Sequence, residues 1–421
     1  MQSKTFAALS LSTFSHHMVR WAKARGYNFN DFQLKICPAT NPQDFNAIAS
    51  EIVRSNNRLK SKFECLSVIR RLVIGSVDDV KQSKVISRLF QCLVNLSELS
   101  MECCSSYINV MQYCGNLRRL EIDVTSKQIS KFTEAFQYCK QLEHFGLTHC
   151  CLFESKDFVY HIMCAIIVHS DALQSLSLRG LNLTKAIKLL NAFKTRRLLQ
   201  ALELYGTSIK ELPIGLFIRS HGSSLKHLML GYPVLFDHCE SIGEFCPQLT
   251  SVDLGKCFES SDILFFLNNA RHLKSFRCQI WSDTTTIAAY ANYHTLDTLH
   301  ISPTWTKNDI RHIMFKWENL IELVLNDCKC STKLLSHCVK LRRLTVTGIT
   351  YLYLEKQLPN LEILKLGVTG YLTNFDSPVS LKTVNYLPAL NEVHCSGYTK
   401  LLALSAVVGS SVKVVLFSWI V

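Results

Sequence analysis

Several features that would place this 421-residue chain in a familiar class are scarce. Glycine (16 residues) and proline (9 residues) are both below average use, which excludes collagen-like and linker-rich architectures. Charged residues make up only 19% of the chain and hydrophobic residues 48%, so the composition excludes a disordered chain and provides for a large core. The N-terminus carries one lysine, Lys4, before a short apolar run, which makes a poor secretory signal.

The motifs of common catalytic and cofactor sites are also missing. The sequence has no phosphate-binding G-x-x-x-x-G-K-S/T or G-x-G-x-x-G loop, no H-E-x-x-H motif and no G-x-S-x-G motif. The apolar stretch 401–421 is interrupted by polar residues such as Lys413, so it is a poor transmembrane helix. We therefore expect no enzyme activity, no cofactor and no membrane association.

What the chain does contain is an internal repeat. Leucine or another apolar residue recurs at positions 1, 4 and 6 of successive units, with a spacing of 20 to 31 residues that is typical of leucine-rich repeats. These three positions face a shared core, and the short strands stack side by side. The pattern predicts an α/β fold: a leucine-rich-repeat solenoid, as a right-handed horseshoe with a concave parallel sheet and convex helices. The first residues of the clear units are Leu96, Leu117, Leu142, Leu173, Leu199, Leu225, Leu249, Leu273, Leu296, Leu320, Leu341, Leu361 and Leu390.

The two ends of the repeat are less regular. Between residues 35 and 95 the register is open, because either Leu59 or the set Ile69, Leu72 and Ile74 can supply the next strand. Further upstream, the set Phe29, Phe32 and Leu34 also fits the pattern. We predict an N-terminal segment, 1–58, of degenerate repeats or F-box-flanking sequence, followed by the solenoid over 59–421. At the C-terminal end, Val412, Val415 and Phe417 predict a final strand, which accounts for the apolar stretch better than a membrane span.

The 18 cysteines follow the repeat. Eleven fall at recurring places in the repeat: three or four residues before position 1, at position 6, or three residues after position 6. We interpret them as small buried residues with free thiols. The nearest metal-like cluster, Cys328, Cys330, His337 and Cys338, reuses two of these positions, and we expect no metal ion. Reduced thiols indicate a cytoplasmic or nuclear protein. The eleven are Cys92, Cys104, Cys114, Cys139, Cys150, Cys246, Cys257, Cys278, Cys328, Cys338 and Cys395.

Phe245 to Cys257, in which one cysteine precedes and one follows the strand, resembles the cysteine-containing leucine-rich repeats of F-box proteins. The resemblance covers the chain from about Leu59 onward. It implies the substrate-recognition subunit of an SCF-type cullin ubiquitin ligase, which binds a target protein on its concave surface. The F-box itself is not found: Met18 to Trp21 is its best remnant, without the Leu-Pro opening. Either an F-box lies upstream, in which case a Skp-type adaptor and a cullin are partners, or the chain is an interaction scaffold with no ligase link.

The net charge of +13 raises the question of a nucleic-acid partner. From Ile69 onward, the strand positions that face away from the core (2, 3, 5 and 7) carry twelve basic and eleven acidic residues. This balance favours a protein over nucleic acid as the partner. Interfaces favour large aromatic and basic side chains, which selects eight candidate partner-binding residues over neighbouring units. They are Tyr205, His227, Met229, Lys274, Arg277, Trp281, His300 and Trp305.

Overall fold

A computed structural model describes the chain over 19 stretches, separated by residues whose placement is too uncertain to describe. The chain divides into two compact units, Met1–Pro213 and Ile214–Val421. The predicted boundary between 58 and 59 is not tested by this division and stays a prediction. The described residues are 33–36, 70–74, 90–91, 93–101, 111–124, 134–149, 156–181, 183, 189, 199–205, 214–231, 236–257, 269–280, 295–303, 318–325, 338–347, 358–367, 388–396 and 413–417.

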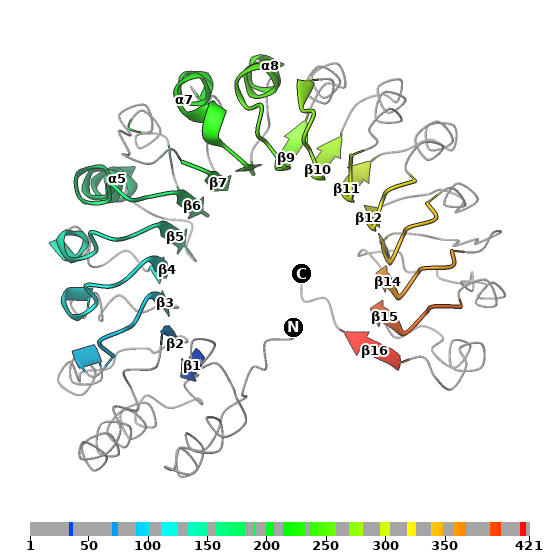
Figure 1. Cartoon of the computed structure of the whole chain (residues 1–421), viewed down its shortest axis with the longest axis horizontal. Helices are drawn as coiled ribbons and strands as arrows, with labels where there is room; N and C mark the ends of the chain where they lie inside the picture. Colours follow the sequence, from blue (N-terminus) through cyan, green and yellow to red (C-terminus); the bar gives the residue numbers. More distant parts are fainter. Residues whose placement is uncertain are drawn as a thin grey trace, which may run out of the picture. The chain divides into compact units, whose positions relative to one another are not determined.

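The first unit is built on a parallel sheet whose strands pair in sequence order. Its helices lie on one side of the sheet and leave the other side open (Figure 1). The described strands are β1 (Gln33–Ile36), β2 (Arg71–Ile74), β3 (Glu98–Met101), β4 (Arg119–Val124), β5 (His144–His149), β6 (Ser175–Arg179) and β7 (Ala201–Tyr205). The described helices are the 3₁₀ helix η5 (Phe136–Tyr138) and α5 (Lys156–His169).

The second unit repeats this arrangement. Its strands are also parallel and pair in sequence order. The strands are β8 (His227–Leu230), β9 (Ser251–Cys257), β10 (Ser275–Ile280), β11 (Thr298–Pro303), β12 (Glu322–Leu325), β13 (Arg343–Thr347), β14 (Ile363–Gly367), β15 (Glu392–Ser396) and β16 (Lys413–Phe417). The described helices are α7 (Ile214–His221), the 3₁₀ helix η6 (Gly222–Ser224) and α8 (Phe236–Phe245).

A repeated set of backbone hydrogen bonds holds each strand to the one before it. The N–H groups at positions 2 and 3 both donate to the carbonyl oxygen at position 2 of the preceding unit, as Ser97 and Glu98 do to Arg70 at 2.9 and 2.8 Å. The apolar positions 1, 4 and 6 lie in the core: Leu117 and Leu120 are 0% exposed. This is the leucine-rich-repeat solenoid that the sequence predicts.

The helix α5 packs against the core through a stripe of apolar side chains. Val159, Ile162, Met163 and Ile166 are all 0% exposed, and their spacing of three and four residues places them along one face of a helix. The apolar stripe of α5 therefore faces the sheet, as expected for a helix that covers a parallel sheet.

Four of the five described buried cysteines occupy one structural position, three residues before position 1. The carbonyl oxygen there accepts the position 1 N–H, as from Leu117 to Cys114 at 3.0 Å. Cys114, Cys139, Cys246 and Cys338 are at most 2% exposed, and burial raises the pKa of each thiol to about 12. The prediction of buried free thiols is confirmed for these four and for Cys278, which is 3% exposed. The side chains of the other six lie outside the described residues.

The structure settles the register at both ends. Arg71 to Ile74 form β2, which favours the set beginning at Ile69 over Leu59. In β1, Leu34 aligns with Leu72, so the predicted set Phe29, Phe32 and Leu34 was wrong by two residues.

The predicted C-terminal strand exists, but its register differs by one residue. The backbone of β16 aligns Val414 with Val393, so position 4 is Val414 and not the predicted Val415. A one-residue slip exchanges the two faces of a strand. The cause is visible in the sequence: residues 414–417 are all apolar, so alternation gives no sign of which face is buried.

Candidate protein-binding face

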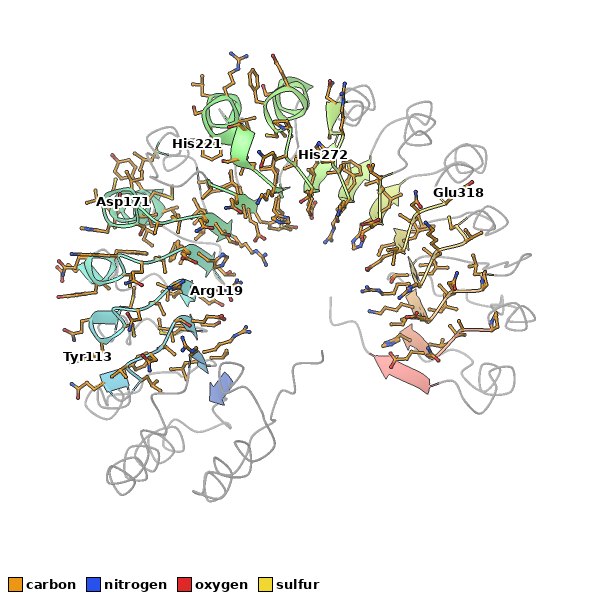
Figure 2. All side chains as sticks on the ribbon, viewed as in Figure 1. Tyr113, Arg119, Asp171, His221, His272 and Glu318 are labelled. Carbon is orange, nitrogen blue, oxygen red and sulfur yellow. The ribbon has the colours of Figure 1, made fainter. Side chains whose placement is uncertain are left out.

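The open side of each sheet, called here the open face, is formed by strand positions 2, 3, 5 and 7. Because side chains alternate along a strand, these positions point away from the core that positions 4 and 6 fill. In Figure 2, Arg119 of β4 lies on the open side of its sheet, whereas Tyr113 lies on the opposite side. A rigid backbone ladder thus presents polar side chains in rows across neighbouring strands.

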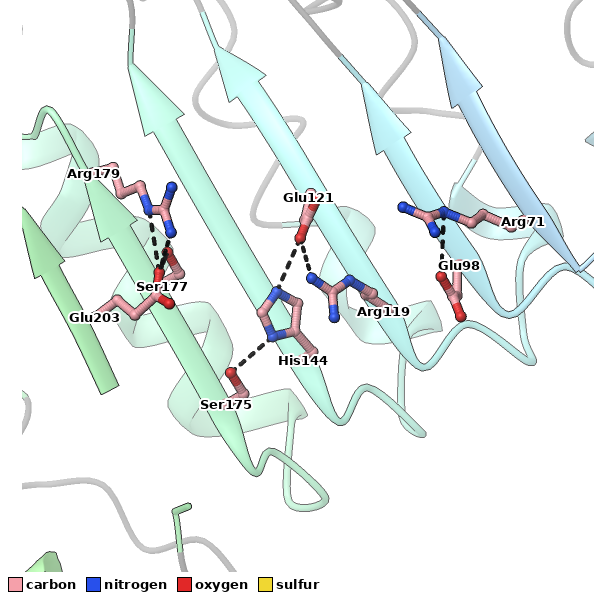
Figure 3. Close-up of polar contacts among 9 residues, drawn as sticks. All are labelled: Arg71, Glu98, Arg119, Glu121, His144, Ser175, Ser177, Arg179 and Glu203. Atoms are coloured by element: carbon pink, nitrogen blue, oxygen red, sulfur yellow. Dashed lines mark hydrogen bonds and ion pairs between the residues drawn. The ribbon is translucent and has the colours of Figure 1, made fainter. Parts of the chain in front are cut away.

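In the first unit, basic and acidic side chains on the open face are paired (Figure 3). Arg71 lies 3.5 Å from Glu98 on the next strand. Arg179 lies 2.5 Å from Glu203, which also accepts a hydrogen bond of 2.7 Å from Ser177. Burial raises the pKa of Glu203, but the hydrogen bonds from Arg179 and Ser177 outweigh it, so the pKa is lowered. The paired charges leave this stretch with little net field.

His144 of β5 links two neighbouring strands. Its Nδ1 lies 2.8 Å from the Ser175 hydroxyl, and its Nε2 lies 3.4 Å from Glu121, which also pairs with Arg119. The hydrogen bond from His144 is the largest cause that lowers the pKa of Glu121 to about 2. The contacts of Ser175, His144 and Glu121 resemble a nucleophile relay. However, the Ser175 N–H already donates to Glu143 at 3.0 Å, so it cannot stabilise an oxyanion, and we interpret the group as structural.

In the second unit, the structure brings three of the predicted binding residues into one row. Strand pairing aligns Met229, Asp253, Arg277 and His300 at position 5 of β8 to β11. The Arg277 side chain is 59% exposed and lies 3.5 Å from Asp253. His300 is half-buried, with Nε2 3.7 Å from Glu322. Burial is the largest cause that lowers the pKa of His300, and the charge of Arg277 lowers it further.

The other predicted residues are placed less uniformly. His227 and Lys274 are exposed at positions 3 and 2 of two repeats that are separated by one other repeat. Tyr205 is 51% exposed but belongs to the first unit. Trp281 and Trp305 lie outside the described residues. Whether these residues bind a partner stays a prediction.

A β-bulge at the end of β9 was not predicted from the sequence. The pairing steps from Asp253 to Lys256 while β10 advances only from Arg277 to Gln279, so β9 holds one extra residue. Gly255 adopts a φ of +58°, and its N–H donates to the Asp253 carboxylate at 3.0 Å. Glycine tolerates this backbone conformation and short polar side chains stabilise it, so the sequence Asp-x-Gly at a strand end was the available signal.

Among the described helices, none is long and apolar enough to cross a membrane. Within the same part of the chain, no group of three or more histidine, cysteine or carboxylate side chains is arranged to hold a metal ion.

No family model matches the chain, and no curated protein matches it. Among solved structures, an internalin (inlF) from Listeria monocytogenes is similar at 13% identity, with a TM-score of 0.38, over 83% of this chain and 94% of that one. An internalin C2 from the same organism is similar at 14% identity, with a TM-score of 0.26, over 55% of this chain and 74% of that one. Both likenesses are too distant to bear on function.

Proposed function

We propose that the chain is a leucine-rich-repeat interaction scaffold that binds a partner protein on its open face. The observation that supports this is the division of each strand. In β10 and its preceding residues, Leu273, Phe276 and Cys278 lie in the core. Lys274 and Arg277, which alternate with them in the sequence, are exposed. A row of exposed charged and hydroxyl side chains on a rigid sheet offers complementary contacts to another protein without any chemical step.

The exposed ion pairs support recognition more than stability. Arg118 lies 3.6 Å from Glu143 and Arg342 lies 3.7 Å from Glu362, with both arginines 61% exposed. Exposed pairs of this kind contribute about 0 to 1 kcal/mol to folding. They can exchange their partners for groups on a bound protein at small cost, and mixed charge selects a partner of matching pattern.

A finer form of this proposal comes from the resemblance to F-box proteins. In that form the chain holds a target on the open face while a Skp-type adaptor brings a cullin and a charged conjugating enzyme close. Proximity would then raise the effective concentration at a lysine of the target. The chain itself would carry out no reaction.

The scaffold proposal is tested by affinity capture with the full chain. We expect the double variant Lys274→Glu, Arg277→Glu to lose specific partners that the unaltered chain captures. The matched control, Lys140→Glu with Arg219→Glu, changes the charge equally at exposed positions outside the strands and should keep those partners. Capture that is undiminished by the open-face variant would contradict the proposal.

The ligase form needs a separate measurement. The chain and the product of any longer reading frame are tested in parallel for capture of a Skp-type adaptor and a cullin. Capture by either product supports the ligase form. If neither product captures them while the open-face variant still loses its partners, the scaffold stands and the ligase form fails.

A further inference from the structure

Charge is distributed unevenly along the open face, although its total is nearly balanced. At positions 2, 3, 5 and 7, the described residues of β2 to β7 carry five basic and five acidic side chains, and those of β11 to β15 carry three and four. The same positions of β8 to β10 carry three basic side chains and one acidic side chain, Asp253. The three are Lys226, Lys274 and Arg277.

The two lysines flank one hydroxyl residue, Thr250. The Thr250 N–H donates to the backbone carbonyl oxygen of Lys226 at 2.9 Å, and the Lys274 N–H donates to that of Thr250 at 2.8 Å. The three residues therefore lie side by side at position 2. Both lysines are exposed and Thr250 is half-buried. Strand pairing aligns a second row behind it: His227, Ser251 and Ser275. We call Lys226, His227, Lys274 and Arg277 the basic patch.

The single acid does not neutralise the basic patch. Asp253 is 18% exposed, and one carboxylate oxygen accepts the Gly255 N–H at 3.0 Å while the other lies 3.5 Å from Arg277. This carboxylate therefore stabilises the bulge of β9 and pairs with one arginine, Arg277. The lowered pKa of His300 on the next strand fits this picture, since the charge of Arg277 adds to the effect of burial.

The neighbouring strands limit the length of an anionic partner. The Asp297 N–H donates to Lys274 at 2.8 Å, which places Asp297 directly beside the basic patch, and Glu322 follows on β12. Three strands span about 10 to 15 Å, which an extended chain covers with roughly three to five residues. A nucleic-acid strand that continued across β11 and β12 would meet these carboxylates and be repelled.

We propose that the open face of β8 to β10 binds a short acidic segment, a run of aspartate and glutamate side chains, of the partner protein. This inference rests on the proposed function and names the chemistry of the partner. Carboxylates of the segment pair with Lys226 and Lys274 and accept hydrogen bonds from the hydroxyls of Ser251 and Ser275 in the second row. Charge-assisted hydrogen bonds of this kind are the stronger ones at a surface.

The test is a fluorescence anisotropy titration of the full chain with a labelled peptide of alternating glutamate and serine, about six residues long to span the patch. The double variant Lys226→Gln, Lys274→Gln should raise the Kd about tenfold, as expected for two lost charge contacts. The control Arg118→Gln, Arg342→Gln removes the same charge from the same strand position in balanced stretches and should leave the Kd within about twofold. A matching lysine and serine peptide should not bind.

Three results would overturn the inference. An equal rise in Kd for both double variants would mean that the peptide senses only net charge. An oligonucleotide of equal charge that binds more tightly than the peptide, and is weakened by the same variant, would mean a nucleic-acid site. Absence of peptide binding, while Lys274→Glu with Arg277→Glu still abolishes partner capture, would leave the proposed function standing and the acidic segment wrong.

Discussion

Glu121 has the most strongly shifted carboxyl pKa among the described residues. Its side chain accepts from His144 of β5 and pairs with Arg119 of its own strand, and these contacts hold its pKa at about 2 instead of 4.5. A depressed carboxyl pKa contributes stability above the unfolded value, and this contribution is lost as the pH falls from about 4.5 towards 2.

The substitution Glu121→Gln tests this link between charge and folding. Because the side chain is 39% exposed, solvent screening reduces the expected loss to about 1 kcal/mol at pH 7. The difference from the unaltered chain should shrink at pH 3, where the native carboxylate begins to protonate. Urea unfolding at both pH values measures it, with Glu98→Gln, which removes a 3.5 Å exposed pair, as a control of near-zero cost. Equal differences at the two pH values would contradict the assignment.

At the scale of the element, the turn before each strand is where neighbouring repeats come closest. Gly222 and Cys246 occupy the same position, three residues before position 1, in successive units. A Cβ atom on Gly222 would lie 2.6 Å from the Phe245 carbonyl oxygen and 2.9 Å from the Cys246 sulfur. The Phe245 carbonyl oxygen belongs to the backbone, so it cannot move away without shifting the end of α8.

We therefore predict that Gly222→Ala destabilises the second unit by about 1 to 3 kcal/mol through overpacking. Gly115→Ala is the matched control, because a Cβ atom there meets nothing within 4 Å; its effect should stay within about 0.5 kcal/mol. Denaturant midpoints for the two variants decide the matter. Similar midpoints would show that the close approach at Gly222 is relieved at little cost.

For the whole molecule, stability should arise from the stacking of neighbouring repeats. Each described strand pairs with the adjacent unit, so no repeat has a closed core of its own. The solenoid should therefore tolerate the removal of a whole repeat but not of part of a repeat. Leu341 and Leu361 hold the same position in successive units, 20 residues apart.

Deletion of residues 341–360 should therefore preserve the fold, because it brings Leu361 into the place of Leu341 and restores the ladder. Deletion of residues 341–350 should unfold part of the second unit, because the next strand then arrives out of register. Far-UV circular dichroism and thermal unfolding distinguish the two. A half-repeat deletion that retains full cooperative unfolding would contradict the solenoid account.

The fold class, most of the register and the burial of the five described cysteines of the repeat were predictable from the sequence alone. Those features follow from local periodicity: a leucine at position 1 and a cysteine three residues before it repeat the same environment in each unit. The alternation of apolar and polar residues did not predict the register at Val414 and Val415, because apolar residues occupy both faces of that strand.

Which charges meet across strands is visible only in the three-dimensional arrangement of the repeats. His144 contacts Ser175, which is 31 residues away in the sequence, and Glu203 contacts Arg179, which is 24 residues away. The periodicity within one repeat does not show which side chains make such contacts. The bulge at Gly255 and the excess of basic side chains on β8 to β10 also depend on how neighbouring strands pair. A near-zero total charge on the open face conceals a basic patch, because binding depends on which charges are neighbours in space.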